Sequence, residues 1–423
     1  MDLLKAWFLS LHPQVRWQTI GRGVYQAGHG LFHFYTPLIF VNQLGFSATT
    51  IGLGVGSASI ASVIGHILAG SLVDLQPVGR RGTLLMAAGL AVAASLSLGA
   101  TPHLWLLVVA NLLFGLSMGL YWTAADAAVM DVTTAENRAS AFAVLGVADS
   151  VGRGVGVLSG GWILAALLHP QTLFLLNSLI FLGFLGLTLV TIAETRQPHE
   201  PTSSLVGWQT ALSDKALWLF VLISCLFTTY MALVNTTLPL YFTTVLSSST
   251  AAMPSSPQTV GTLFTWGYIA LAALLQVPLV RLLSPLGWAR ALMVDLAIWG
   301  FGFLAIWTLG TVLPVHFTLE LGVLALLAIA TVIYKPFAST FLAELAPETM
   351  RGTYTAIGHQ CWAIGYFLGP TLGGWAIDQA PVVAHLSWIG LAMSTGVGIA
   401  LLVWFTQWRA AEQWQYDAER HSL

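Results

Sequence analysis

The sequence predicts an all-α membrane protein with twelve transmembrane helices arranged as two six-helix repeats. Three observations lead to this prediction. The 423 residues are 57% hydrophobic and only 8% charged, with a mean hydropathy of +0.80, whereas a soluble domain carries roughly 25% charged residues. Apolar runs of about 20 residues, the length that crosses a bilayer core, recur along the whole chain. The second half of the chain also repeats the pattern of the first.

The repeat is clearest where the segment Arg351–Trp375 matches Arg138–Trp162 without a gap. The matched positions are Gly152 and Gly365, Gly156 and Gly369, Gly160 and Gly373, Gly161 and Gly374, and Trp162 and Trp375. The same register joins Tyr121 to Tyr334 and Asp131 to Glu344. Each copy must bury the same faces, so a repeat of this length predicts two copies of one structural unit.

The apolar runs give the expected boundaries of the spans and of the two halves. We predict spans at residues 17–41, 49–73, 82–100, 104–130, 139–168, 171–193, 216–245, 259–283, 288–310, 317–343, 352–378 and 385–408. The stretch at 194–215 is polar and contains proline, as expected of a linker. The predicted organisation is an N-terminal six-helix half at 1–193, a cytoplasmic linker at 194–215 and a C-terminal six-helix half at 216–423.

The positively charged residues predict the orientation in the membrane. Twelve of the fifteen lysines and arginines lie at or beyond span ends on the side that carries both chain ends, and the other three, Arg22, Arg153 and Lys335, lie deeper within spans. Positive residues collect on the cytoplasmic side of membrane proteins. We therefore expect a multi-pass protein of the plasma (inner) membrane with both termini in the cytoplasm.

The composition argues against several classes of function. The net charge of −2 gives no reason to expect a nucleic-acid partner. The two cysteines, Cys225 and Cys361, lie inside apolar runs and are interpreted as small core residues rather than a disulfide or metal site. We find no nucleophile with a nearby base, no cluster of metal ligands and no phosphate-binding loop. The sequence therefore predicts neither an enzyme nor a bound cofactor or metal.

The loop between the second and third spans combines two glycines, an acid and two arginines. These residues are Gly70, Asp74, Gly79, Arg80 and Arg81. A carboxylate can face the N-terminus of a neighbouring helix, and an arginine can face an acidic helix end, which holds one conformation of a bundle. We predict a gating role, with Asp131 or Glu136 as the anionic partner at the end of the fourth span. The alternative is a plain positively charged loop.

Together, the two six-helix halves and this loop resemble the major facilitator superfamily over nearly the whole chain. The resemblance implies a transporter whose halves rock around a site at the middle of the membrane. Gly79 lies farther from Asp74 than the family pattern has it, so the turn is expected to differ.

The glycines of span eleven narrow the resemblance. Gly365, Gly369 and Pro370 resemble a motif that drug/proton antiporters of the superfamily carry in span five. Span five of this chain has Val157 at the position of the proline, and close helix packing explains the glycines equally well. Asn111 in span four stands where those antiporters have an arginine linked to proton coupling. The drug/proton antiporter branch is the nearest resemblance.

Span one has one polar face. Arg22, Gln26, His29 and His33 follow at helical spacing and lie on the same side of the helix. Polar groups in a membrane helix face protein or a wet cavity, because exposure to lipid is costly. We predict a cavity lining, and a hydrogen-bonded seam between helices is the alternative. Arg22 lies near the inner end, so a side chain that reaches out to the membrane surface is an equal alternative for it.

Other ionisable groups are expected near the same cavity. They are Asp126, Asp149, Arg153, Lys335 and His359, with Tyr334 beside the lysine. An unpaired charge is costly, so we expect Arg153 to pair with Asp126 or Asp149. Lys335 has no obvious acid partner and is the first candidate for contact with substrate. The cations outnumber these aspartates, which favours a substrate with an anionic or electron-rich group.

These observations predict a secondary transporter that moves a small organic solute by alternating access, with proton-coupled efflux as one form. Substrate contact is assigned to Arg22, Gln26, His29, His33, Tyr334, Lys335 and His359. Proton coupling is assigned to Asp126, Asp149 and Arg153, with His29 and His33 as further candidates. Gating is assigned to Gly70, Asp74, Gly79, Arg80, Arg81 and Asp131.

Two alternatives to efflux remain open. One is a symporter or facilitator of a sugar or an organic acid. The other is a non-transporting assembly factor of a membrane complex, which would fill its centre with apolar side chains and pair every buried charge. The expected partners are a small-molecule substrate, protons and the lipid bilayer, and the chain is expected to act as a monomer.

Overall fold

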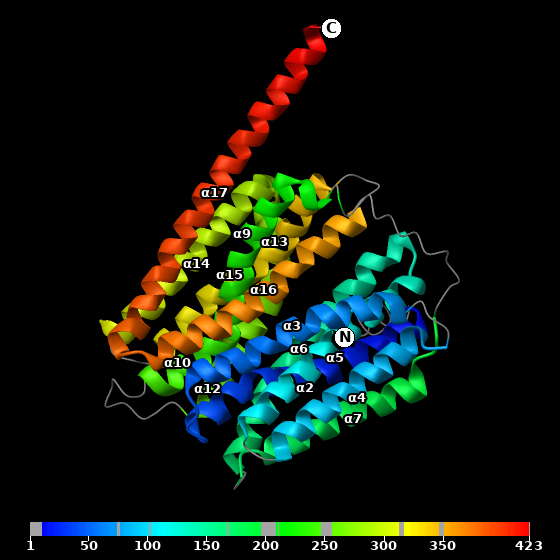
Figure 1. Ribbon diagram of the computed structural model, residues 1–423, viewed down its shortest axis with the longest axis vertical. Helices are drawn as coiled ribbons and strands as arrows, with labels where there is room; N and C mark the ends of the chain where they lie inside the picture. Colours follow the sequence, from blue (N-terminus) through cyan, green and yellow to red (C-terminus); the bar gives the residue numbers. More distant parts are fainter. Residues whose placement is uncertain are drawn as a thin grey trace.

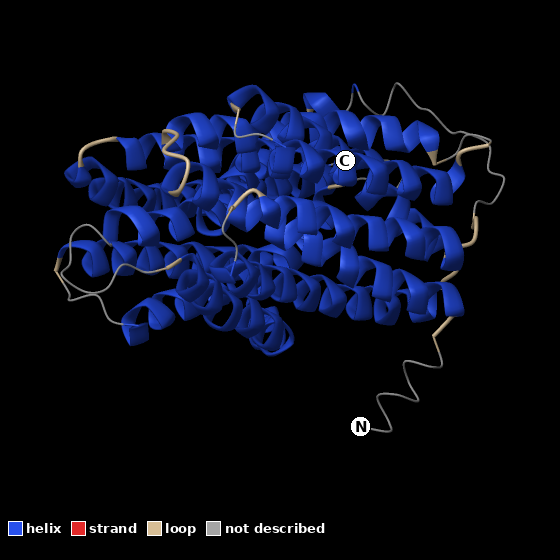
Figure 2. Cartoon of the chain, turned by 90° about the horizontal axis from the view of Figure 1, so that it is seen from below, coloured by secondary structure: helices blue, strands red, loops and turns tan. Residues whose placement is uncertain are grey.

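The predicted spans are helices in the computed structural model. The structure describes residues 11–73, 77–100, 103–166, 169–195, 209, 211–246, 256–312, 317–346 and 351–422. Within these ranges the chain is helical and contains no strand, as Figure 2 shows. The predicted linker lies largely outside the described residues, which stop at 195 and resume at 209 and 211.

Six helices form the N-terminal half. They are α2 (Pro13–Asn42), α3 (Ala48–Leu72), α4 (Gly79–Ala100), α5 (Leu104–Asp131), α6 (Ala135–Ala166) and α7 (Thr172–Thr191). Their ends follow ordinary signals. Pro13 opens α2, and the Ser47 hydroxyl accepts a hydrogen bond from the backbone N–H of Thr50 to cap α3. Gly45, in the turn before Ser47, has a φ of 73°, which suits glycine.

The helices of the C-terminal half contain π-helical turns. The seventh span runs through α9 (Lys215–Ala232), η1 (Leu233–Thr237), α10 (Leu238–Tyr241) and η2 (Phe242–Leu246), and the eighth through α12 (Pro257–Leu263), η3 (Phe264–Ala270) and α13 (Leu271–Leu283). A short 3-10 turn, η4 (Ser284–Leu286), precedes α14 (Gly287–Thr311), α15 (Phe317–Leu345), α16 (Arg351–Asp378) and α17 (Pro381–Ser422). The last helix extends past its predicted end at residue 408 and projects from the bundle in Figure 1.

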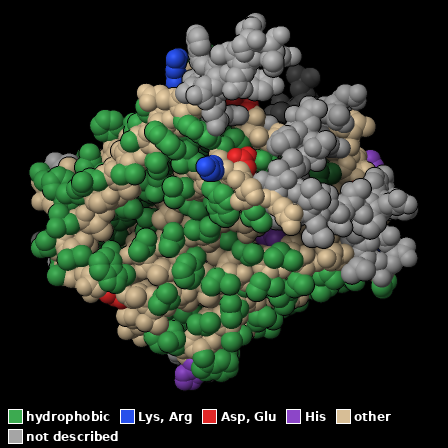
Figure 3. Space-filling view, turned by 45° about the horizontal axis from the view of Figure 1, so that its top comes forward, with side chains coloured by type: hydrophobic (Ala, Val, Ile, Leu, Met, Phe, Trp, Pro, Cys, Tyr) green, Lys and Arg blue, Asp and Glu red, His purple; other side chains and the backbone are tan. Residues whose placement is uncertain are grey.

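Length and hydropathy agree with a membrane-embedded bundle. Eight apolar stretches within the described residues are long enough to cross a membrane, and the longest, Pro257–Thr311, holds two spans. The helices α2, α6 and α16 are not among these stretches, and they carry the polar and glycine-rich faces noted in the sequence. The surface in Figure 3 is mostly hydrophobic, with few charged side chains. An apolar surface of this extent fits lipid rather than water.

Glycines let the first and fifth helices of each half approach closely. A Cβ on Gly156 of α6 would meet the backbone of Ala27 in α2, and a Cβ on Gly369 of α16 would meet Ala232 in α9. The two copies of the repeated segment therefore build the same kind of helix pair, as the repeat predicts.

The two halves touch closely at the end of the bundle opposite the chain termini. There α3 packs on α16, with Gly52 against Pro370 and Gly374 against Ala48, and α6 packs on α12, with Gly161 against Gln258. Figure 1 shows α3 (blue) beside α16 (orange) near α10, with the two helices separating towards their other ends. This arrangement is closed at one end.

Candidate functional site

The centre of the N-terminal half holds a buried arginine between two aspartates. Arg22 on α2 donates from Nε to Asp149 Oδ1 on α6 at 2.8 Å and from Nη1 to Asp126 Oδ1 on α5 at 2.9 Å. The arginine side chain is 8% exposed, whereas those of Asp149 and Asp126 are 19% and 39% exposed. We call these three residues the ion triad. Its net charge is negative, and Asp126 is its most accessible member.

Aromatic residues fix the arginine of the triad. The guanidinium carbon of Arg22 lies 4.5 Å from the ring centre of Trp122 on α5, at cation–π distance. Tyr121 stacks on Tyr25 of α2 with ring centres 3.7 Å apart, and Tyr25 meets Ser117 through its hydroxyl at 3.2 Å. Arg22 is thus held inside the half and does not reach out to the membrane surface, which excludes that alternative.

Arg153 does not make the ion pair that we expected. Asp126 and Asp149 both bind Arg22, and no carboxylate within the described part of the chain lies within 4 Å of Arg153. Its Nε is buried without a hydrogen-bond partner. The physical reason is position, because the backbone of Arg153 packs against Gly30 on α2, further along the helix than Arg22. The expectation paired Arg153 with Asp149 on its own helix or with Asp126 on α5, and it overlooked the arginine on α2 as the partner of both acids.

The polar face of α2 turns towards α5, α6 and the other half. The rings of His29 and His33 are 4.9 Å apart, and both lie close to Phe114 of α5. His33 also meets Tyr366 of α16 with ring centres 6.4 Å apart. Gln26 is fully buried, and neither its amide oxygen nor its amide nitrogen has a partner in the described residues. Arg22 thus hydrogen-bonds across helices as a seam would, whereas the Gln26 amide and His29 Nδ1 have no partner within the described residues.

Lys335 and His359 are exposed side chains on neighbouring helices of the C-terminal half. His359 on α16 interacts electrostatically with Lys335 on α15, His66 on α3 and Asp126 on α5. Four helices from both halves thus direct ionisable groups into one region. Exposed polar groups on membrane helices require water or a polar ligand, since lipid solvates them poorly. This region lies towards the end of the bundle that carries the termini.

Tyr334 differs from its neighbour Lys335, because it belongs to the packed interior. Its ring stacks on Phe227 with centres 4.7 Å apart, and its hydroxyl lies 3.7 Å from Cys361 Sγ. Only 3% of Tyr334 is exposed. A substrate in the accessible region would meet Lys335 and His359 rather than this ring.

The predicted gating loop forms a compact network. Arg80 donates from Nε to Asp131 Oδ2 at 2.9 Å and from Nη1 to the carbonyl oxygen of Val73 at 2.6 Å. Asp131, one of the two acids proposed as partner, therefore fills that position, whereas the side chain of Glu136 lies outside the described residues. Asp74 also lies outside them. Gly70 is exposed, with open space where a Cβ would stand.

Glu194 is a member of this network that the sequence did not reveal. Its carboxylate accepts hydrogen bonds from the backbone N–H groups of Arg80 at 3.0 Å and Arg81 at 3.1 Å, at the start of α4. Gly79 has a φ of 62°, and a Cβ there would collide with this carboxylate. The acid at a helix N-terminus satisfies free N–H groups. The sequence feature that could have indicated this role is the position of Glu194 directly after the sixth span, on the same side of the membrane as the loop before α4.

At the closed end, an aspartate joins the two halves. Asp378 at the end of α16 accepts hydrogen bonds from the backbone N–H groups of Ala48 at 2.8 Å and Thr49 at 2.6 Å, at the start of α3. Asp378 was not among the sites predicted from the sequence. The feature that could have marked it is an acidic residue on the side of the protein whose loops contain no lysine or arginine.

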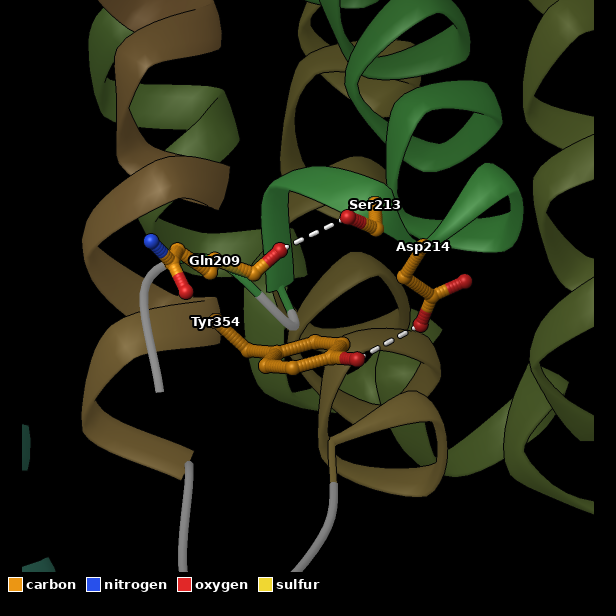
Figure 4. Close-up of a pocket in the computed structure, with 4 residues that line it drawn as sticks. All are labelled: Gln209, Ser213, Asp214 and Tyr354. Carbon is orange, nitrogen blue, oxygen red and sulfur yellow. Dashed lines mark hydrogen bonds between the residues drawn. The ribbon is translucent and has the colours of Figure 1, made fainter. Parts of the chain in front are cut away.

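A depression of about 530 Å³ lies at the other end, where α9 and α16 begin, and Figure 4 shows four residues that line it. The Tyr354 hydroxyl donates to Asp214 Oδ2 at 2.6 Å, while Asp214 Oδ1 caps α9 through the N–H of Ala216 at 2.8 Å. Ser213 donates to the carbonyl oxygen of Gln209 at 2.8 Å. The acid is thus occupied within its own half, and this depression lies apart from the ion triad.

Comparison with known proteins agrees with this architecture. The profile of the Major Facilitator Superfamily matches residues 19–256, more than half of the chain. The chain is 27% identical over 405 residues to multidrug resistance protein MdtH of Cronobacter sakazakii, covering 92% of this chain and 91% of that protein. It is 28% identical over 394 residues to MdtH of Salmonella newport, covering 88% and 90%.

Solved structures share the fold at low sequence identity. The nucleoside transporter NupG superposes with a TM-score of 0.76 at 14% identity, covering 92% of this chain and 98% of that one. A peptide transporter POT in complex with sulfate superposes with a TM-score of 0.70 at 15% identity, covering 93% and 94%. The fold, the repeat and the matched profile agree, and the chain belongs to the Major Facilitator Superfamily as a multi-pass membrane transporter of small molecules rather than an enzyme.

Proposed function

We propose that this transporter exports small organic solutes from the cytoplasm in exchange for protons. The ion triad of Arg22, Asp126 and Asp149 is the observation that carries the proposal. Its two carboxylates face one guanidinium, so the triad bears a net negative charge inside the bundle. Uptake of one proton would leave a neutral set of groups, which is favoured where the dielectric is low.

Asp126 is the proton acceptor in this proposal. It is the most exposed member of the triad, with 39% of its side chain accessible, and it interacts electrostatically with His359 of the other half. A proton on Asp126 would weaken its bond to Arg22, since a charged pair would become a neutral acceptor. Arg22 links α2 to both α5 and α6, so protonation of Asp126 would loosen the link to α5 and leave the bond to Asp149 on α6.

Alternating access follows from the contacts between the halves. The described close contacts lie at one end, where α3 meets α16 and α6 meets α12. Rocking of the halves would break these contacts and bring together the ends of the bundle near the termini. We place those ends in the cytoplasm on the charge pattern of the loops, and the protein in the plasma (inner) membrane. One chain encloses the region, so the proposal needs only a monomer.

The direction of transport rests on the relatives. Proteins named multidrug resistance protein match most of this chain, and a transporter protects a cell from a drug when it moves the drug outwards. Arg153 and the exposed Lys335 give the central region polar contacts beside aromatic rings. We infer a solute that combines an aromatic body with a polar group.

Proton movement across proteoliposomes tests the coupling. The full-length protein is reconstituted with the pH dye pyranine inside, and aromatic anions, cations and neutral compounds are added from outside. We expect at least one class to drive proton movement in the wild type. Asp126→Asn and Asp149→Asn should each abolish it, because the triad then carries no net negative charge.

Asp295→Asn is the matched control for this test. Asp295 of α14 is also a fully buried aspartate, but both of its carboxylate oxygens lack partners and it lies outside the triad. Its variant should keep solute-driven proton movement. Wild-type flux that ignores the pH gradient would indicate a facilitator, and proton and solute moving in the same direction would indicate a symporter. Either result contradicts the proposed exchange.

A further inference from the structure

The region between the two halves contains a second arginine, Arg153, which does not pair with the aspartates of the ion triad. Arg153 lies on α6 with its backbone against Gly30 of α2, and its Nε is buried without a partner. The nearest acid along its helix, Asp149, binds Arg22 at 2.8 Å. An unpaired guanidinium at this depth raises the free energy of the folded protein unless something else satisfies it.

The described groups that interact with Arg153 carry no negative charge. It interacts electrostatically with His29 and His33 on α2, Tyr268 in η3 and Tyr366 on α16. These four residues come from both halves, so Arg153 lies at the interface between them. Imidazole and phenol groups can donate hydrogen bonds to a bound oxyanion, but they cannot neutralise a guanidinium. The pattern is that of a positive site with donors arranged around it.

Gln26 supplies a second unsatisfied group beside this cation. It is fully buried, both polar atoms of its amide lack a partner, and its Cβ packs against Gly152, the residue before Arg153. A buried amide without hydrogen bonds is costly, as is the unpaired arginine. Two such groups near each other, each without hydrogen-bond partners, indicate that a polar ligand supplies the missing hydrogen bonds.

Aromatic rings continue from this polar site along α16. Trp362 and Tyr366 have ring centres 5.9 Å apart, and Tyr366 also approaches His33. The π-helical turn η3, which carries Tyr268, packs against α6, the helix of Arg153. Such turns are frequent at functional sites. A flat organic body could lie against these rings while its polar group reaches Arg153.

We propose that Arg153 binds a carboxylate or similar oxyanion of the transported solute, with Gln26 and the two histidines as donors and with Trp362 and Tyr366 against an aromatic body. This inference rests on the proposed export of organic solutes and specifies their chemical class as aromatic acids. The planar fork of arginine suits a carboxylate because it donates two parallel hydrogen bonds. The anion and the proton occupy different residues, so coupling between them acts through the rocking of the halves.

Equilibrium binding to the purified full-length protein tests the inference. The probes are naphthoate and its neutral amide, naphthamide, which share one aromatic body. Each is titrated while the thermal unfolding temperature is measured, since a ligand of the folded state stabilises it by mass action. We expect the wild type to bind naphthoate about tenfold or more tightly than naphthamide, the size of a charge-assisted hydrogen bond.

Variants assign the preference to Arg153. Arg153→Gln should bind the two probes equally, and Arg153→Lys should keep part of the preference for the acid. Arg281→Gln removes an exposed arginine of α13 and should leave the preference intact. A wild type without preference for naphthoate overturns the inference, as does an undiminished preference in Arg153→Gln. If that variant does not fold, the comparison of wild type with Arg153→Lys decides.

The binding test is independent of proton coupling. Loss of the naphthoate preference together with intact solute-driven proton movement would reject the anion site alone. A preference that depends on Arg153, together with proton movement that persists in Asp126→Asn and Asp149→Asn, would reject the proposed coupling and keep the anion site.

Discussion

The seam between α2 and α6 and the seam between α9 and α16 are two copies of one structural design. In each, glycines of the fifth helix of the half meet the backbone or small side chains of its first helix. Gly152 meets Gly23 and Gly156 meets Ala27, while Gly365 meets Thr228 and Gly369 meets Ala232. The repeated sequence therefore preserves the helix packing.

The side chains beside these glycines differ sharply between the halves. By the same contacts, Arg22 corresponds to Phe227, and by the repeat, Asp149 corresponds to Trp362 and Arg153 to Tyr366. The N-terminal half thus carries buried ions where the C-terminal half carries aromatic rings. Phe227 stacks on Tyr334 with centres 4.7 Å apart and needs no counter-charge. The comparison teaches that the helix packing is repeated, whereas within the described residues the ion triad occurs at this seam in the N-terminal half and aromatic rings occur there in the C-terminal half.

Removal of the triad arginine should give the largest effect. Arg22→Met leaves two aspartates facing each other without a cation, and we expect the free energy of unfolding to fall by about 3–5 kcal/mol. Solute-driven proton movement should disappear. Stability is measured by SDS denaturation of the purified protein, and proton movement in proteoliposomes.

The triple variant Arg22→Met, Asp126→Asn, Asp149→Asn provides the control. It removes all three charges, as the C-terminal half does at the equivalent places, so most of the lost stability should return while proton movement stays absent. An Arg22→Met protein as stable as the wild type would contradict the claim that the N-terminal half, unlike the C-terminal half, needs a buried cation at this seam.

Valine at the packing glycines should affect both halves alike. Gly156→Val and Gly369→Val each place a branched side chain against the facing helix, at Ala27 and Ala232. We expect each to lower the free energy of unfolding by about 1–3 kcal/mol, the usual effect of overpacking. The same SDS denaturation measures both.

Glycines with free space beside them serve as controls for this pair. A Cβ on Gly186 of α7 or on Gly396 of α17 would meet nothing within 4 Å. Valine at either position should change stability by less than about 0.5 kcal/mol. If Gly156→Val were costly and Gly369→Val were neutral, the symmetry of the scaffold would be disproved.

The fold was accessible from the sequence because it depends on periodic and repeated features. Long apolar runs give the spans, and the matched glycines around Gly156 and Gly369 give the two equivalent helix pairs. The departures occur where local geometry decides. The π-helical turns η1, η2 and η3 depend on backbone shifts within an unbroken apolar run, and the sequence pattern is the same with or without them.

The site was harder to predict because it depends on contacts between distant segments. Helical spacing placed Arg22 and Gln26 on one face but did not reveal that Arg22 reaches Asp126 and Asp149. The sequence suggested Arg153 as the partner of Asp126 or Asp149, whereas in the structure both acids bind Arg22 on α2. Caps such as Glu194 on α4 likewise join residues far apart in the chain.

The closed end offers a third comparison, since within the described residues a carboxylate joins the halves at one of its two corners. Asp378 accepts from two N–H groups of α3, whereas Gln258 of α12 meets Gly161 of α6 by backbone contact. Asp378→Ala should destabilise the closed end by about 0.5–2 kcal/mol, the value of a helix cap. The population open at that end should rise by about two- to thirtyfold.

Spin-label distances report this population. Labels are attached at the exposed positions Ile67 of α3 and Ile364 of α16, in a protein without Cys225 and Cys361. When the closed end opens, the other ends of the two halves approach, and the distance between the labels shortens. The fraction of molecules with this shorter distance should be larger in Asp378→Ala than in the wild type. Gln258→Ala is the matched change at the other corner and should alter the distances less. Equal effects at the two corners would mean that the carboxylate adds nothing to closure.

The smallest expected difference concerns two glycines at equivalent turns. Gly79 before α4 and Gly287 before α14 have φ of 62° and 74°, so alanine at either should cost about 1–2 kcal/mol of stability. Gly79→Ala carries a further cost because its Cβ collides with the Glu194 carboxylate, whereas the position at Gly287 is open. We expect SDS denaturation to show Gly79→Ala as the less stable variant by about 1 kcal/mol, the value of the lost cap. In a Glu194→Ala background this difference in stability should vanish. A difference that persists there would show that the extra cost of Gly79→Ala does not come from the collision with the Glu194 carboxylate.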